Sequence, residues 1–259
     1  MKQSELKALL DQKYLQYNRP DFVEDDPVQI PHLFTEQADI EISGFLTALI
    51  AWGRRDLIIR SAKRLIEAMD MAPHQFLMQA EKQDWHRLEG FVHRTFNGID
   101  CLALLQALRE AYQAHESLEE LFLAGIKTND TDVGGAIVAA RTQLTSGPDF
   151  PARTHKHLAN PARGSSAKRI NMFLRWMVRQ DNAGVDFGLW KRIDPALLIV
   201  PLDVHTGTIA RKLGLLDRKQ NDWKAALALT EKLREMCPED PVRYDFSLFG
   251  LGVYKELAD

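Results

Sequence analysis

One aspartate and one lysine of this sequence lie at predicted helix starts, where their charges could take part in a reaction. Asp203 follows an apolar run and opens a predicted helix in Val200-Pro-Leu-Asp-Val-His-Thr, so its carboxylate is expected to be partly buried. Lys168 falls in the first turn of another predicted helix, where the partial positive charge of the helix N-terminus disfavours an ammonium group. A lysine that loses its proton is a nucleophile. Lys168 is therefore a candidate nucleophile, and Asp203 is a candidate buried carboxylate near a basic stretch.

Each of these residues also has an ordinary structural interpretation. Aspartate is a common N-cap residue, which would explain Asp203 without any chemistry. The lysine belongs to a set of polar residues at helical spacing, which describes a basic surface face on an amphipathic helix capped by Ser165 or Ser166. This predicted face consists of Lys168, Asn171, Arg175 and Arg179.

The charge of the chain is unevenly distributed along the sequence. The net charge is -3, which by itself argues against a nucleic-acid partner. However, the segment 150–180 contains seven Lys or Arg residues and no acid, whereas 21–41 contains no Lys or Arg. A local positive field suits phosphate binding, although scattered solvated charges would give the same counts. The second basic stretch consists of Arg54, Arg55, Arg60, Lys63 and Arg64.

Hydrophobic periodicity predicts an all-α protein. Apolar residues recur at helical spacing almost throughout the 259 residues, and alternating strand-like runs are scarce. The Pro/Gly/Ser-rich stretch near 145–165 is the only candidate domain boundary. Asp56 is a plausible N-cap for the helix that ends before Pro73. Helices are expected near residues 1–20, 42–52, 56–69, 102–112, 118–123, 133–144, 166–180, 204–213, 222–236 and 240–255.

The composition excludes several classes of protein. Cys101 and Cys237 lie far apart, which excludes a disulfide framework, a zinc site of CxxC pairs and a four-cysteine iron–sulfur cluster. No apolar run approaches the length of a membrane span, and the polar start is unlike a signal peptide. We therefore expect a cytoplasmic protein with no cofactor, no metal and no membrane partner, and a monomer as the default.

The segment around Asp203 resembles endonuclease III and the 8-oxoguanine DNA glycosylases of the helix-hairpin-helix superfamily. In those enzymes a Val-Asp-x-His sequence opens a helix and its aspartate is essential. The similarity continues through Arg-Lys-Leu-Gly-Leu to Ser247-Leu-Phe-Gly-Leu-Gly, and Ser43-Gly-Phe-Leu-Thr-Ala-Leu-Ile-Ala-Trp-Gly-Arg-Arg-Asp resembles their first helix–loop–helix. It covers residues 40–70 and 160–255. The resemblance implies one glycosylase-like unit over 1–259, in which a cleft separates a subdomain of about 30–150 from one of about 160–259. Helix 1–20 is a candidate to join the second subdomain.

The whole sequence is more narrowly similar to an uncharacterised bacterial family of the DUF2400 type. The similarity rests on Gly164-Ser-Ser-Ala-Lys-Arg-Ile-Asn-Met-Phe-Leu-Arg-Trp-Met-Val-Arg and Pro201-Leu-Asp-Val-His-Thr. The superfamily's usual hairpin, Leu-Pro-Gly-Val-Gly-x-Lys, is replaced by Asn160-Pro-Ala-Arg-Gly-Ser-Ser-Ala-Lys168. The gap from Lys168 to Asp203 is also longer than usual. Its excess, 180–193, is interpreted as an inserted loop and short helix. Archaeal 8-oxoguanine glycosylases have a similar hairpin and gap, which favours Lys168 as the Schiff-base lysine.

The resemblance implies base-excision repair of DNA by a glycosylase with AP-lyase activity. The enzyme would flip a damaged base, such as 8-oxoguanine, out of double-stranded DNA into a pocket between its helical halves. Lys168 would attack the sugar and form an imine, while Asp203 would stabilise the positive charge. Candidate base-pocket residues are Trp52, His93 and Trp176, each of which could instead be a packed core residue. Candidate DNA-binding residues are Arg54, Arg55, Arg153, Lys156, Arg163, Ser165, Ser166, Arg169 and His205.

Two other functions fit parts of the pattern. The leading alternative is a DNA- or RNA-binding module that keeps the glycosylase fold without its chemistry. A metal-dependent hydrolase is a poor alternative, because its candidate ligands lie on a loop and at a helix start without a second carboxylate cluster. Those ligands would be His155, His157, Asp203 and His205.

Overall fold

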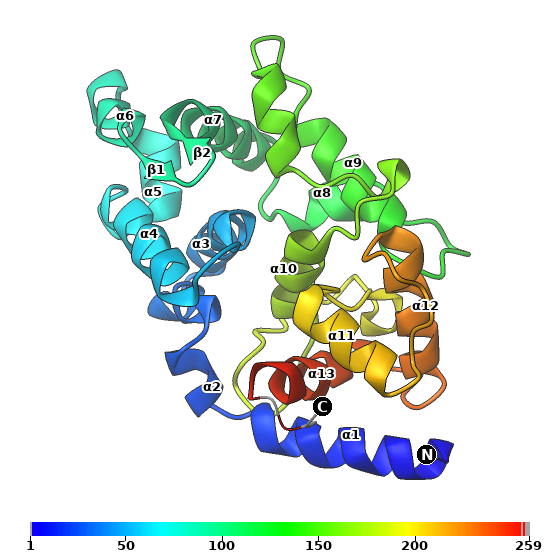
Figure 1. Ribbon diagram of the computed structural model, residues 1–259. Coiled ribbons are helices and arrows are strands. Elements are labelled where there is room, and N and C mark those ends of the chain that lie inside the picture. The colour runs from blue at the N-terminus through cyan, green and yellow to red at the C-terminus, as the bar shows by residue number, and fades with distance from the viewer. Residues whose placement is uncertain (1, 255, 257–259) are drawn as a thin grey trace. The chain divides into compact units, whose positions relative to one another are not determined.

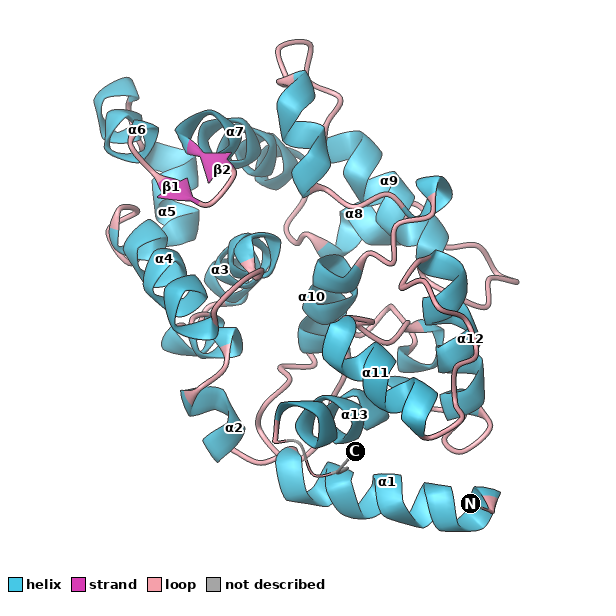
Figure 2. Cartoon of the chain, viewed as in Figure 1, coloured by secondary structure: helices cyan, strands magenta, loops and turns pink. Residues whose placement is uncertain are grey.

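The computed structural model describes residues 2–254 and 256, and the regular secondary structure of this part of the chain is almost all helix (Figures 1 and 2). The predicted all-α class is confirmed, with a two-residue antiparallel hairpin as the exception. The helices are α1 (Gln3–Tyr17), α2 (Asp21–Glu24), α3 (Gln37–Ile50), α4 (Arg55–Glu67), α5 (Pro73–Gln79), α6 (Lys82–Glu89), α7 (Gly98–Ala114), α8 (Glu119–Leu123), α9 (Gly134–Leu144), α10 (Lys168–Val178), α11 (Val204–Lys212), α12 (Trp223–Arg234) and α13 (Tyr244–Val253). The strands are β1 (Val92–His93) and β2 (Phe96–Asn97). Short 3-10 helices are η1 (Pro27–Gln29), η2 (Pro31–Leu33), η3 (Ala152–His157), η4 (Pro161–Arg163), η5 (Pro195–Leu197) and η6 (Pro241–Arg243).

The chain forms two compact units, and each is assembled from separate stretches of sequence. Unit 1 comprises residues 1–22, 128–134 and 160–259, and unit 2 comprises 23–127 and 135–159. The sequence-based division at about 30–150 and about 160–259, with helix 1–20, stays a prediction; it did not foresee that residues 128–134 belong to unit 1. The chain therefore leaves unit 1 within α2, passes through it again at 128–134, and returns to it at residue 160, before α10.

Unit 2 is built around α3, an apolar helix that is buried from Ile40 to Ile50. Helices α4 and α5 pack against α3, and α7 packs against α5 and α6. Glu41 is a fully buried carboxylate on α3, and it accepts hydrogen bonds from Tyr112 Oη at 2.6 Å and from the Leu118 amide at 2.8 Å. These bonds fasten the start of α8 to the core helix.

Unit 1 is organised around α13, which packs against both α1 and α11 (Figure 1). Two glycines permit these approaches. A Cβ atom added to Gly250 would lie 2.2 Å from the Tyr17 ring of α1, and one added to Gly252 would lie 3.1 Å from the His205 Cβ of α11. Ser247 Oγ also donates to the Leu10 carbonyl at 2.7 Å. The apolar last helix is therefore the core of unit 1.

The close approach at Gly250 predicts a large loss of stability in Gly250→Ala. The added methyl group has no space beside Tyr17, and overpacking of this kind costs about 1–3 kcal/mol. Urea unfolding should show a lower midpoint for this variant. Gly147→Ala is the control, because nothing lies within 4 Å of its added Cβ. An unchanged midpoint in Gly250→Ala would contradict the packing of α1 on α13.

Three local predictions were wrong. Helix α4 begins at Arg55 with Arg54 as its N-cap, so Asp56 lies inside the first turn, where it pairs with Arg54. Helix α10 has Ala167 as its N-cap, in the left-handed region at φ 50°, without a side-chain cap. The segment 180–193 contains no helix and forms an irregular loop.

Candidate active site

Lys168 and Asp203 lie together in unit 1. The Lys168 Nζ is 3.9 Å from Asp203 Oδ2, and the side chains are 27% and 22% exposed. Both are therefore shielded from bulk water yet reachable. The distance is an ion-pair contact longer than a hydrogen bond, so neither group is locked by the other. The long gap between them in the sequence does not keep the nucleophile candidate from the carboxylate.

Asp203 is held by its position as the N-cap of α11. Its Oδ1 accepts the Thr206 amide hydrogen at 2.9 Å, and its backbone carbonyl accepts from the Asn221 side chain at 2.8 Å. Because Oδ1 is committed to the cap, Oδ2 is the oxygen presented to Lys168. The structural and the chemical interpretations of Asp203 are thus compatible, since each uses a different oxygen.

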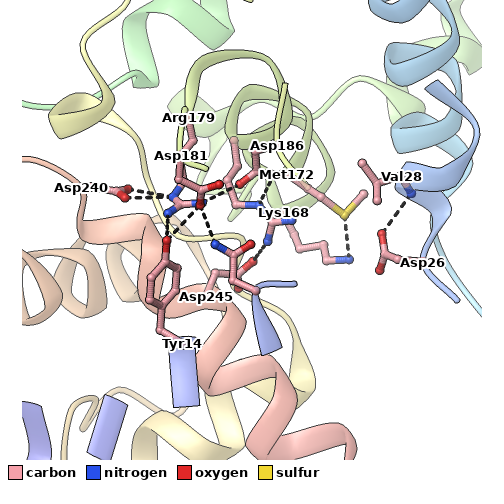
Figure 3. Close-up of polar contacts among 12 residues, drawn as sticks. Tyr14, Asp26, Val28, Lys168, Met172, Arg179, Asp181, Asp186, Asp240 and Asp245 are labelled. Carbon is pink, nitrogen blue, oxygen red and sulfur yellow. Dashed lines mark hydrogen bonds and ion pairs between the residues drawn. The ribbon is translucent and has the colours of Figure 1, made fainter. Parts of the chain in front are cut away.

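Lys168 is the first residue of α10 and is positioned by the turn before it. Ser165 Oγ accepts the Ala167 amide hydrogen at 3.2 Å, and the Asn171 side-chain amide donates to the Ser166 carbonyl at 3.0 Å. The serines therefore shape the turn rather than cap the helix. The Lys168 Nζ also contacts the Met172 sulfur at 3.8 Å, one helical turn along (Figure 3). Its contacts with Asp203 and Met172 are both longer than an ordinary hydrogen bond between nitrogen and oxygen.

The prediction of a basic surface face on α10 was wrong beyond Lys168. Asn171, Arg175 and Arg179 are only 1%, 4% and 1% exposed. Buried guanidinium groups need anionic partners. The inserted loop supplies one that both share, because Asp186 pairs with Arg175 at 3.2 Å and with Arg179 at 3.0 Å.

Arg179 is the centre of a buried ion-pair cluster, drawn in Figure 3. Its Nη1 donates to Asp181 at 2.6 Å, its Nε to Asp240 at 2.9 Å and its Nη2 to the Tyr14 hydroxyl at 2.7 Å. Burial opposes the charge, but Asp186 and Asp240 hold the pKa of Arg179 above its usual range. Burial also raises the pKa of Asp240 to about 6, although Arg179 acts in the opposite direction. The cluster joins α1, the inserted loop and the segment before α13 to α10.

Asp245 is a residue of this region that the sequence analysis missed. It is 5% exposed, and its Oδ2 accepts from Arg175 Nη1 at 2.5 Å. Burial raises its pKa to about 6; the charges of Arg175 and Lys168 lower it, and the charge of Asp203 raises it. A carboxylate in the first turn of an otherwise apolar helix was the available signal.

In unit 2 the structure brings two base-pocket candidates together. The Trp52 ring lies edge-to-face with His93, with centroids 5.2 Å apart, and stacks on His157 at 5.7 Å. His93 is buried, which lowers its pKa, and its Nδ1 is 2.9 Å from Ser61 Oγ. His93 is thus a packed residue, whereas Trp52 keeps some exposure.

The DNA-contact candidates of unit 2 are mostly exposed. Arg54 pairs with Asp56, and Lys156 is exposed on η3. Arg153 donates to the buried carboxylate of Asp100 at 3.1 Å, so it also anchors η3 to α7. Arg55 is partly buried at the start of α4.

The remaining candidates belong to unit 1. Arg163, Ser165 and His205 are exposed and Ser166 is partly buried. Burial lowers the pKa of Arg169 to about 10. Trp176 is fully buried in α10, which favours its alternative role as a core residue.

Two of the four ligands considered for a metal-dependent hydrolase, His155 and His157, lie beside other polar groups. His155 Nδ1 is 3.0 Å from an Arg141 nitrogen, and His157 Nε2 is 3.3 Å from Asp100 Oδ2, both within unit 2. Within residues 2–254 and 256, no group of three or more His, Cys, Asp or Glu side chains is arranged to hold a metal ion. No helix in the same part of the chain is long and apolar enough to cross a membrane.

Comparison with known proteins identifies the family. A family model described as "Protein of unknown function (DUF2400)" matches residues 26–254, and the chain belongs to this family. The match includes both Lys168 and Asp203. No curated protein and no solved structure matches the chain significantly.

Proposed function

We propose that this protein is a DNA glycosylase with AP-lyase activity, which removes an oxidised purine such as 8-oxoguanine from double-stranded DNA. The observation that carries the proposal is the 3.9 Å contact between Lys168 Nζ and Asp203 Oδ2 in a partly shielded setting. An amine nucleophile beside a carboxylate is the combination that a glycosylase/lyase requires. The resemblance of the Pro201–Thr206 and Ser43–Asp56 segments to the helix-hairpin-helix glycosylases supports the same function.

In the proposed reaction the neutral Lys168 amine attacks the anomeric carbon of the flipped nucleotide. The new C–N bond forms as the bond from the sugar to the base breaks, and the base leaves with that electron pair and takes up a proton. Opening of the sugar ring gives a protonated imine. Loss of a C2′ proton then expels the 3′ phosphate by β-elimination, and water releases the lysine.

Asp203 supports this sequence electrostatically. Its Oδ2 faces the lysine, so its negative charge is close to the positive charge that develops on the sugar. Its Oδ1 remains bonded to the Thr206 amide, which keeps the carboxylate in place while the substrate changes charge. The carboxylate is also placed to pass the lysine proton to and from the reacting groups.

The decisive experiment is reductive trapping of the covalent intermediate. The protein is incubated with a duplex that contains 8-oxoguanine or an abasic site, and borohydride is added to reduce the imine. We expect a protein–DNA adduct that denaturing gels resolve and that Lys168→Gln abolishes. Lys232→Gln is the matched control, because Lys232 is an exposed lysine of unit 1 paired with Glu235.

The possible results separate the two functions considered for the sequence. Binding of the duplex without any adduct or strand cleavage would contradict the glycosylase proposal and favour a binding module. An adduct that persists in Lys168→Gln would show that a different amine reacts.

A further inference from the structure

The chain between α11 and α12 contacts the Asp203 side of the candidate site. Residues 217–223, which we call the bridging segment, run from the connection after α11 into the first residue of α12 (Figure 1). The Asn221 side-chain amide donates to the backbone carbonyl of Asp203 at 2.8 Å, and the Gly207 amide donates to the same oxygen at 2.9 Å. A carbonyl oxygen has two lone pairs, so it accepts both bonds. One bond begins α11, and the other ties the backbone of Asp203 to the bridging segment.

The other end of the bridging segment contacts the turn that precedes Lys168. The Trp223 amide donates to the Gly164 carbonyl at 3.0 Å, and Asp222 pairs with Ser165 in an isolated antiparallel bridge. Lys168, the first residue of α10, follows directly after this turn. One short segment of unit 1 is therefore hydrogen-bonded to both sides of the candidate site.

Arg211 holds the bridging segment against α11. Its Nε donates to the Arg218 carbonyl at 2.8 Å, and its Nη2 donates to the Lys219 carbonyl at 2.9 Å and to Asn221 Oδ1 at 2.7 Å. The planar guanidinium group fixes the directions of these bonds relative to one another. The Asn221 side chain is consequently held at both ends, because its oxygen accepts from Arg211 while its nitrogen donates to Asp203.

A glycine of α11 leaves room for this arrangement. A Cβ atom added to Gly207 would lie 2.7 Å from Asn221 Oδ1, 2.8 Å from Arg211 Nη1 and 3.1 Å from Asn221 Nδ2. These are the ends of side chains rather than backbone atoms, so Gly207→Ala would displace the Asn221 amide without pushing on the backbone. The missing side chain at this position therefore permits the bond from Asn221 to Asp203.

We propose that the bridging segment sets the separation of Lys168 and Asp203, and that Asn221 is the positioning residue that holds Asp203. The 3.9 Å between Lys168 Nζ and Asp203 Oδ2 is longer than a hydrogen bond, so other contacts must maintain it. The Thr206 amide orients the carboxylate on α11, whereas the bonds of Asn221 and Trp223 relate α11 to the start of α10. Asn221 acts through the backbone of Asp203. Its effect on catalysis rests on the proposed function, but its effect on the distance does not require DNA.

The first test reads the contact of Lys168 with Asp203 without DNA. A water-soluble carbodiimide activates carboxyl groups and joins them to neighbouring amines as amides, and peptide mass spectrometry identifies the joined residues. The Lys168–Asp203 amide should form in the wild type and be absent from Asp203→Asn. In Asn221→Ala its yield should fall several-fold relative to the amide of Lys7 with Asp11, an exposed ion pair on α1 that serves as the internal reference.

Gly207→Ala separates positioning from stability. Alanine is a better helix former than glycine, and its methyl group displaces only the ends of side chains, so the urea midpoint should not fall. The displaced Asn221 amide should nevertheless lower the yield of the Lys168–Asp203 amide, as in Asn221→Ala. Gly147→Ala, whose added Cβ meets nothing within 4 Å, should change neither quantity.

Three results would overturn the proposal. The first is an unchanged yield in folded Asn221→Ala, and Gly207→Ala decides this point if Asn221→Ala does not fold. The second is the absence of the Lys168–Asp203 amide from the wild type, because the two side chains would then not be in contact in solution. The third is a fall that the reference amide on α1 shares, because it reflects a loss of folded protein rather than a loss of positioning.

Single-turnover excision then tests the catalytic consequence. Misplacement of a reacting group by about 1 Å costs on the order of 10²-fold in rate, so Asn221→Ala should lower the maximal rate by about 10- to 100-fold. The enzyme concentration that gives half of this rate should stay the same, because Asn221 holds Asp203 and not the DNA. A changed half-saturating concentration at an unchanged maximal rate would make Asn221 a DNA contact and overturn its positioning role. If the wild type excises no base and gives no trapped adduct, the proposed function fails, while the carbodiimide result still decides the role of the bridging segment.

Discussion

Asp203→Asn is expected to lower the rate of base excision by on the order of 10²–10³-fold while leaving the fold intact. Asparagine is as good an N-cap as aspartate, so the bond to the Thr206 amide and the start of α11 should persist. Only the charge on the oxygen facing Lys168 is removed. Single-turnover excision of 8-oxoguanine, measured with enzyme in excess over DNA, is the appropriate assay.

Comparison with Asp203→Ala separates the contribution of Asp203 as a helix cap from the contribution of its negative charge. Alanine removes both, and the lost cap should cost about 1 kcal/mol in urea unfolding, a loss that Asp203→Asn should not show. Trapping on a pre-formed abasic site should decline less than excision in Asp203→Asn, because the open sugar already presents its carbonyl carbon. If Asp203→Asn excises the base at the wild-type rate, the Asp203 carboxylate serves only as a helix cap.

Arg179→Met should destabilise unit 1 by about 3–5 kcal/mol. Methionine fills part of the volume but leaves Asp181, Asp186 and Asp240 without the guanidinium that compensates their charges. Urea unfolding gives the total loss, and hydrogen exchange of α10 and α13 amides shows whether it is confined to unit 1. Exchange in α3 of unit 2 should change little.

Two further arginine variants test the cause of this loss. Arg179→Lys should recover only a small part of the stability, because one ammonium cannot reach partners on three sides as the planar guanidinium does. Arg19→Met removes an exposed ion pair with Asp21 and should cost less than about 1 kcal/mol. If Arg179→Met lowers the free energy of unfolding no more than Arg19→Met does, the buried cluster does not stabilise the protein.

The helices around the candidate site could be predicted because their signals are local. The apolar lead-in to Asp203 and the glycine after Leu213 mark α11, which spans Val204–Lys212. The cap of α10 could not be predicted in the same way. Alanine rarely adopts the left-handed conformation that Ala167 has, and the neighbouring serines are more common caps.

The environment of α10 was misjudged for a different reason. Helical periodicity separates the apolar side of a helix from its polar side, but it does not reveal whether the polar side is buried against opposite charge. Arg175 and Arg179 look like surface residues until Asp186 and Asp245 are placed beside them. These carboxylates come from an irregular loop and from the last helix. Their pairing with the arginines therefore depends on the tertiary structure and cannot be inferred from the local sequence. The proximity of Lys168 to Asp203 is equally long-range, and only the family resemblance pointed to it.

The packing of α1 on α13 has a consequence for the order in which the molecule is made. Ser247 Oγ and its acceptor, the Leu10 carbonyl, are 237 positions apart in the chain, while unit 2 is completed by residue 159. During translation, α1 therefore leaves the ribosome early, and it cannot pack against α13 until the whole of unit 2 has been synthesised. The apolar side of α1, which includes Leu10 and Tyr14, stays uncovered throughout this interval. Nascent chains arrested before α13 thus present a binding site for chaperones that the finished protein conceals.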